Sequence, residues 1–394
     1  LFSYILLLDV GLLALTFHRR WHFLAAMAAV GTVLMELSWM GEFFVRERYF
    51  EGNRILVALA VFAGFAGLFN AAWWRGRDRS ELKVWLWASA ILMSAVALSV
   101  VPYWFGFEPL GGRPGLMFAY VLLIDLGLLL LAWSERRLLS VEPAAGGAVF
   151  LLLTIWIAGH LDTALLYWGL GLVFLFAFLH SLIPVVRRRL QPELPVTWWG
   201  HLFPLAALGL MLIPIFRMDP VPFGVWPFVM LLNLVVVGLA LAWGSVVGLV
   251  ASVLLTLCVA ACWILRLPPA LEQLGPELFI IGAFAVFFIA AGVVVARRLN
   301  ATSGDGLGAR PAAGGFGSLE LAAGWLPQIP ALSAVLPFSL LILVRQRLAL
   351  AGPSALFGLA LLLVVLMLSL ALAFGLAWLP LVGLACVLAL EHAW

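Results

Sequence analysis

Apolar residues fill the chain in runs of helix length, and short polar or basic segments separate these runs. A helix needs about 20 apolar residues to cross a bilayer. By this criterion the sequence predicts fourteen membrane-spanning helices, at residues 2–17, 22–44, 54–74, 82–104, 116–133, 146–160, 163–186, 197–216, 225–243, 245–265, 277–296, 325–346, 354–374 and 376–394. Tight turns at residues 159–162, at residues 243–245 and near Gly375 separate some of these spans, and two spans could instead form one kinked helix there. The predicted fold class is all-α, a polytopic integral membrane protein.

The composition agrees with residence in a bilayer. Hydrophobic residues make up 65% of the chain and charged residues 10%, whereas a soluble domain has about 25% charged residues. Lys and Arg lie in short clusters between apolar runs, and they are more numerous after odd-numbered spans. The positive-inside rule therefore predicts that these loops face the cytoplasm and that both ends of the sequence face the periplasm. We expect a multi-pass protein of the bacterial inner membrane, with membrane lipids and other membrane or envelope proteins as partners and no nucleic acid.

One polar motif recurs inside the apolar runs. An aspartate follows a Phe-x-Tyr pair at Asp9 and again at Asp125, and a degenerate third copy has Phe228 in place of the tyrosine and Asn233 in place of the aspartate. The copies are 116 and 108 residues apart, which is four predicted spans each time. An even number of spans gives the copies the same orientation, so the sequence predicts parallel four-helix repeats.

The predicted organisation follows from this repeat. It comprises a first repeat at residues 1–115, a second at 116–222, a third, degenerate repeat at 223–348 and a terminal helix hairpin at 349–394. Residues 301–318 are rich in Gly and Ala and are predicted to form a mobile loop. Because the sequence starts inside an apolar run, we expect it to be the ordered part of a longer polypeptide.

The first spans also resemble a known group of proteins. The segment from Tyr4 to Ala14, the basic Arg19-Arg20-Trp21, and residues 31–34 with Trp39 downstream are similar to the bacterial membrane proteins grouped as Domain of Unknown Function 2339. The similarity is clearest from residue 1 to about residue 190. Members of that family have many helices with such repeats, often behind a soluble N-terminal segment. No activity is established for them, so the resemblance implies a class of membrane protein and no catalytic residue.

The motif residues have two interpretations. Asp9, Asp125 and Asn233 could line a polar path for protons or ions or bind a polar head group, or they could form hydrogen bonds that fix the register of neighbouring helices at about 0.6 to 2 kcal/mol per contact. Asn233 cannot bind a proton but can still make the hydrogen bond, which favours the structural interpretation. In both cases, we expect the three side chains to point into the bundle, because a carboxylate in hydrocarbon is costly.

Three further residues are candidates for a functional role. Glu36 lies in the middle of the second predicted span without a basic residue one turn away, so it is expected to be protonated or paired across helices. It is the best single candidate for function, although a structural role is the expected outcome. His160 and Asp162 complete the set of candidate buried polar positions. They lie in a turn between two apolar runs and could form a hydrogen-bonded pair at the membrane surface, which is the core of many acid-base sites. The sequence predicts no cofactor or metal site, and Cys258 and Cys262, one helical turn apart, are interpreted as packing residues.

Three functions remain open on this basis. The favoured one is a non-enzymatic membrane protein that acts as a scaffold or as a transport or lipid-handling component of the cell envelope. The second is a proton- or ion-linked transporter that uses buried carboxylates. The third is a membrane enzyme that acts on a lipid-linked substrate near His160.

Overall fold

The computed structural model describes the chain except for residues 20, 46–48, 50–53, 192–197, 244–245, 268–273, 305–327, 349 and 351. Every regular element in this described part is helical. Among the described residues, twelve helical segments are long and apolar enough to cross a membrane. The protein is therefore an all-α, multi-pass membrane protein. The predicted total of fourteen spans stays a prediction.

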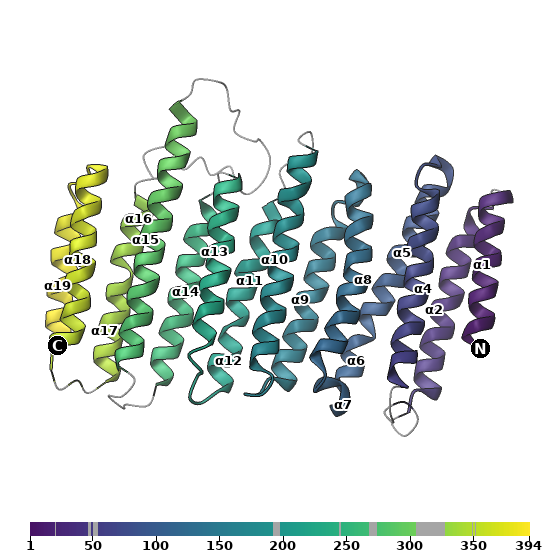
Figure 1. Ribbon diagram of the computed structural model, residues 1–394, viewed down its shortest axis with the longest axis horizontal. Coiled ribbons are helices and arrows are strands. Elements are labelled where there is room, and N and C mark those ends of the chain that lie inside the picture. The colour runs from purple at the N-terminus through teal and green to yellow at the C-terminus, as the bar shows by residue number, and fades with distance from the viewer. Residues whose placement is uncertain are drawn as a thin grey trace. The chain divides into compact units, whose positions relative to one another are not determined.

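The helices fall into two compact units, which are described separately. Unit 1 comprises residues 1–161 and 167–172, and unit 2 comprises residues 162–166 and 173–394. The helices of unit 1 are α1 (Phe2–Arg19), α2 (Phe23–Phe43), α4 (Ile55–Gly76), α5 (Ser80–Ser99), α6 (Val101–Phe105), α7 (Glu108–Gly111), α8 (Pro114–Ser134), η1 (Arg136–Leu138), α9 (Val141–His160) and the beginning of α10 (Leu166–Leu190). Long helices that follow one another along the chain run in alternating directions (Figure 1).

Unit 2 begins with the rest of α10. Its other helices are η2 (Trp198–His201), α11 (Leu202–Leu210), α12 (Leu212–Arg217), α13 (Val225–Trp243), α14 (Val247–Arg266), α15 (Leu274–Gly304), α16 (Gln328–Val335), α17 (Pro337–Arg347), α18 (Ser354–Phe374) and α19 (Leu379–Ala393). The turns at residues 159–162 and near Gly375 separate helices. Helix α9 ends at His160, and α18 ends at Phe374, where Gly375, with a positive φ of 67°, forms a left-handed cap. At the third turn, α13 ends at Trp243, and residues 244–245 lie outside the described residues. The loop prediction is wrong for residues 301–304, because α15 continues to Gly304. Residues 305–318 lie outside the described residues.

Prolines divide three of the predicted spans into two helices each. Pro102 follows the break between α5 and α6, Pro214 follows the break between α11 and α12, and Pro337 begins α17 directly after α16. Proline has no N–H group to donate to the carbonyl four residues earlier, so the helical hydrogen bonding is interrupted at each of these points. Such interruptions are tolerated in membranes where neighbouring helices surround the freed backbone groups.

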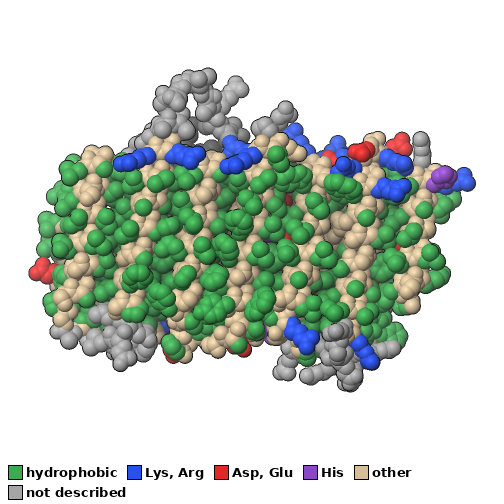
Figure 2. Space-filling view, in the orientation of Figure 1, with side chains coloured by type: hydrophobic (Ala, Val, Ile, Leu, Met, Phe, Trp, Pro, Cys, Tyr) green, Lys and Arg blue, Asp and Glu red, His purple; other side chains and the backbone are tan. Residues whose placement is uncertain are grey.

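The surface of the helices is apolar along their length. Figure 2 shows hydrophobic side chains covering the sides of the helices, whereas Lys and Arg lie at the helix ends. Leu372 of α18 is 88% exposed, and Leu7 of α1 is 72% exposed. Contact with lipid explains this exposure of leucine, since water would penalise it.

Candidate polar site between α1 and α2

Asp9 of α1 forms a hydrogen bond with the helix that follows it. The Thr32 hydroxyl of α2 donates to Asp9 Oδ2 at 2.6 Å, and both side chains are buried. The buried face of α2 also contains Ala25, Ala28 and Ala29. Small residues allow two membrane helices to approach closely, which brings a short threonine side chain within reach of the partner helix.

Glu36 lies one helical turn beyond Thr32, on the same face of α2. Its side chain is fully buried, and within the described residues neither carboxyl oxygen has a hydrogen-bond partner. Asp9 is close enough to interact with it electrostatically. Two buried carboxyl groups therefore lie together between α1 and α2, one bonded to Thr32 and one with both oxygens available.

The helices around this pair add further polar groups to the interior of unit 1. Tyr120 of α8 interacts electrostatically with Glu36, and its hydroxyl donates to the carbonyl of Ala97 at 2.9 Å. In the neighbouring pair of helices, Asn70 Nδ2 of α4 lies 3.1 Å from the hydroxyl oxygen of Ser94 in α5 and donates to it. These contacts link α2, α4, α5 and α8 through polar groups inside an otherwise apolar unit.

The three motif residues are all buried, as predicted from the cost of exposing them to lipid. Asp9 is 2% exposed, and Asp125 and Asn233 are fully buried. In unit 2, Asn233 Nδ2 of α13 donates to Thr256 Oγ1 of α14 at 2.9 Å. Asn233 and Thr256 are 23 residues apart, as are Asp9 and Thr32.

An aromatic contact accompanies each motif. Ring centroids are 5.0 Å apart for Phe2 and Trp39, 5.7 Å for Phe118 and Trp156, and 4.7 Å for Trp226 and Trp263. In each pair, the first ring precedes the motif Asp or Asn by seven residues. The predicted repeat thus has the same ring contact in each copy, although its boundaries stay a prediction.

His160 and Asp162 lie in different surroundings from those expected. His160, at the end of α9, is partly buried against Phe105, with ring centroids 6.2 Å apart, and its ring lies against Gly111. Asp162 is exposed, so its place among the buried polar positions was wrong. Its carboxylate accepts the backbone N–H of Leu165 at 2.8 Å and closes the turn before α10. The hydrogen-bonded pair stays a prediction, because these two residues belong to different units.

Sequence reasoning missed several polar residues that the structure places inside the units. Thr32 and Thr256 are the partners of two motif residues, and Glu142 and Glu277 are fully buried near the first turns of α9 and α15. The sequence does not indicate that a threonine inside an apolar span has a hydrogen-bond partner on another helix until the pairing of the two helices is known. The two glutamates lie close to predicted span ends, where a solvated position is the ordinary expectation.

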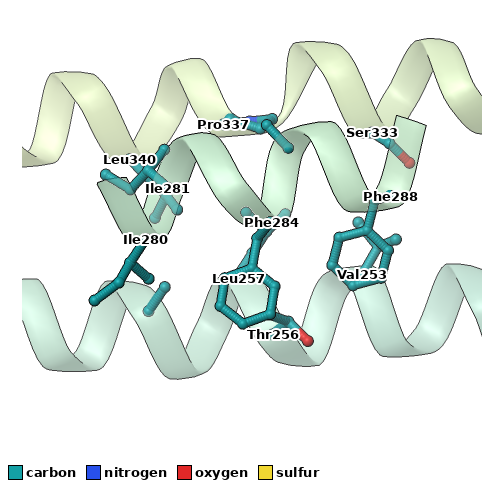
Figure 3. A pocket seen from close by; sticks show the side chains of 12 residues that line it. Val253, Thr256, Leu257, Ile280, Ile281, Phe284, Phe288, Ser333, Pro337 and Leu340 are labelled. Atoms are coloured by element: carbon teal, nitrogen blue, oxygen red, sulfur yellow. The ribbon is translucent and has the colours of Figure 1, made fainter. Parts of the chain in front are cut away.

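A small cavity lies in unit 2 next to Thr256. It has a volume of about 20 Å³ and lies between α14, α15 and the α16–α17 pair (Figure 3). This volume is enough for about one water molecule. Phe284, Phe288 and aliphatic side chains form most of its wall. The cavity is too small and too apolar to hold a polar substrate.

The described residues contain no group of three or more His, Cys, Asp or Glu side chains that could hold a metal ion. Comparison of the chain with known protein families, with curated proteins and with solved structures finds no match.

Proposed function

We propose that the protein is a transport component of the bacterial inner membrane in which Glu36 and Asp9 bind and release a proton. The observation that supports this function is the state of Glu36: it is fully buried, it lies near a second carboxyl group, and its oxygens have no hydrogen-bond partner among the described residues. Intramembrane ionisable residues of this kind mark proton relays and ion pathways.

Two other buried polar side chains differ from Glu36 because they form hydrogen bonds between helices. Asp9 with Thr32 and Asn233 with Thr256 form bonds between neighbouring helices, which is what a structural role requires. Glu36 makes no such bond in the described part of the chain, so its carboxyl group adds no hydrogen bond between helices there. A carboxyl group costs about 2.5 to 3.5 kcal/mol at the centre of a membrane helix on insertion scales. A functional role accounts for this cost better than a structural one.

The positions also suggest how a proton would move. Glu36 lies closer than Thr32 to the end of α2 at Phe43, and the Thr32 hydroxyl is already bonded to Asp9. A hydroxyl both donates and accepts hydrogen bonds. We therefore expect a proton that enters at Glu36 to reach Asp9 through Thr32 after a rotation of the Glu36 side chain.

A complementation experiment tests this role. A deletion strain receives the Glu36→Gln protein, which keeps the shape of the side chain but cannot ionise. The control is Glu42→Gln, which makes the same change at an exposed position of the same helix. We expect normal membrane levels for both proteins on a blot. We expect the Glu36→Gln protein to fail to complement the deletion, whereas the Glu42→Gln protein complements it. Full complementation by Glu36→Gln would overturn the proposal and favour a scaffold in which Glu36 is structural.

A second measurement does not depend on knowing the transported substrate. Infrared difference spectra of the purified protein between acidic and alkaline buffer report the carbonyl band of each protonated carboxyl group. We expect Glu36→Gln to remove one buried carboxyl band that Glu42→Gln leaves in place. An unchanged spectrum would show that Glu36 does not exchange protons.

A further inference from the structure

A groove runs along unit 1 between α1 and α4. Its volume is about 690 Å³, and Val10, Leu13, Leu68 and Ala71 form part of its apolar wall. Val10 is 46% exposed, which places this part of the wall on the lipid-facing surface of α1. Small side chains at Ala14, Ala71 and Ala72 leave the space between the two helices open.

One end of the groove is basic. His18, Arg75 and Arg79 line it there, where α1 and α4 both end, and all three side chains are exposed. Figure 2 shows basic and histidine side chains at this end of α1. Within the described residues none of the three belongs to a salt bridge, whereas nearby Lys83 is paired with Glu135. Among the described residues, no carboxylate therefore forms an ion pair with these three side chains.

Arg79 is held in place at this end. Its Nη1 donates to the carbonyl oxygen of Phe17 at 3.0 Å, and its guanidinium carbon lies 5.6 Å from the centre of the Phe17 ring. An arginine fixed in this way has lost part of its conformational freedom before a ligand binds, which favours binding. Its other N–H groups can still bind an anion.

The length of the groove matches one leaflet of the bilayer. From Val10 to His18 the rise along α1 is about 12 Å, at about 1.5 Å per residue. One leaflet contributes about 15 Å of the hydrocarbon core. An apolar channel of this length, open to lipid and basic at its surface end, has the shape and the charge of a site for one phospholipid.

We infer that the groove between α1 and α4 binds an anionic phospholipid, with its phosphate at Arg75, Arg79 and His18 and an acyl chain along Val10, Leu68 and Ala71. Basic pockets between membrane helices on the cytoplasmic side are suited to such head groups. The predicted topology places this end of unit 1 in the cytoplasm. The site is independent of Glu36, because the groove lies on the outside of α1 and Glu36 lies on the buried face of α2.

The affinity of the purified protein for phosphatidylglycerol tests the site. Native mass spectrometry gives the fraction of protein with bound lipid across a titration, and phosphatidylcholine serves as the zwitterionic comparison. The test variant is Arg75→Gln with Arg79→Gln. We expect its affinity for phosphatidylglycerol to fall about fivefold for each arginine, and thus roughly 25-fold for the pair. The matched control is Arg136→Gln with Arg137→Gln, which removes the same charge from exposed positions at the same end of unit 1.

A second variant tests the apolar part of the groove. Ala71→Phe fills the channel without changing any charge, at a position that is exposed in the structure. We expect it to reduce phosphatidylglycerol binding at least fivefold while the melting temperature of the lipid-free protein stays unchanged. An equal loss in the Arg136 and Arg137 control, or full binding by both groove variants, would overturn the inference.

Discussion

The hydrogen bond between Thr32 and Asp9 allows a quantitative test of how the first two helices are held together. Replacing Thr32 with valine keeps the volume of the side chain and removes the hydroxyl that donates to Asp9 at 2.6 Å. A buried acceptor that loses its donor costs about 1 to 3 kcal/mol. Interhelical hydrogen bonds in membranes average about 0.6 kcal/mol and reach about 1.7 kcal/mol. We therefore expect Thr32→Val to lower the free energy of unfolding by about 1 to 2 kcal/mol.

Thr16→Val provides the matched control for this measurement. Thr16 is also fully buried, but its hydroxyl donates to the Leu12 carbonyl of its own helix at 2.9 Å. That carbonyl can keep its helical hydrogen bond when the hydroxyl is lost, so we expect a change below about 0.5 kcal/mol. Unfolding in mixed detergent micelles at increasing dodecyl sulfate content measures both changes.

A double-mutant cycle between Thr32→Val and Asp9→Ala then isolates the energy of the pair. We expect a coupling energy of about 0.5 to 1.5 kcal/mol, because Asp9 is the acceptor of this bond. Equal destabilisation by Thr32→Val and Thr16→Val, together with a coupling energy of zero, would refute the reasoning.

Three further predictions concern topology and backbone geometry. The first uses a protein in which Cys258, Cys262 and Cys386 are replaced by alanine. We expect Arg113→Cys to react with an impermeant thiol reagent in intact cells and Arg77→Cys to resist it, because the end with more Lys and Arg should be cytoplasmic. Labelling of position 77 alone would reverse the topology. Gly292→Ala should destabilise the protein, since a β-carbon there would lie 3.1 Å from backbone atoms of Pro330. Gly358 faces open space, so Gly358→Ala should stabilise α18 by about 0.5 to 1 kcal/mol. Similar melting temperatures for the two variants would contradict the close approach of α15 and α16. Gly375→Ala should lower the free energy of unfolding by about 1 to 2 kcal/mol because of the left-handed backbone there, and the same detergent titration measures it.

The sequence predicted the fold class and most helix positions because the bilayer imposes a strong pattern. A span must be apolar over about 20 residues, so long apolar runs identify membrane helices directly. The breaks near Gly375 and after His160 follow from local chemistry, and the structure has both. The division of the predicted twelfth span into α16 and α17 was missed, although Pro337 is visible in the sequence as its cause.

The candidate site was only partly predictable. The burial of Asp9, Asp125 and Asn233 followed from the cost of placing them in lipid. Their partners depend on which face of the next helix is turned toward them, and a uniformly apolar helix does not reveal that face. Thr32 and the position of Tyr120 near Glu36 therefore became visible only in three dimensions.

The 23-residue spacing between Asp9 and Thr32 has a consequence for biosynthesis. While α1 alone is in the membrane, Asp9 has no donor from α2, and the cost of its carboxyl group is uncompensated. The donor becomes available once α2 has been synthesised, and the ring contact between Phe2 and Trp39 can form at the same stage. The same sequence of events applies to Asn233 and Thr256 in α13 and α14. We therefore expect the insertion machinery to release these helices into lipid as hairpins and not one at a time.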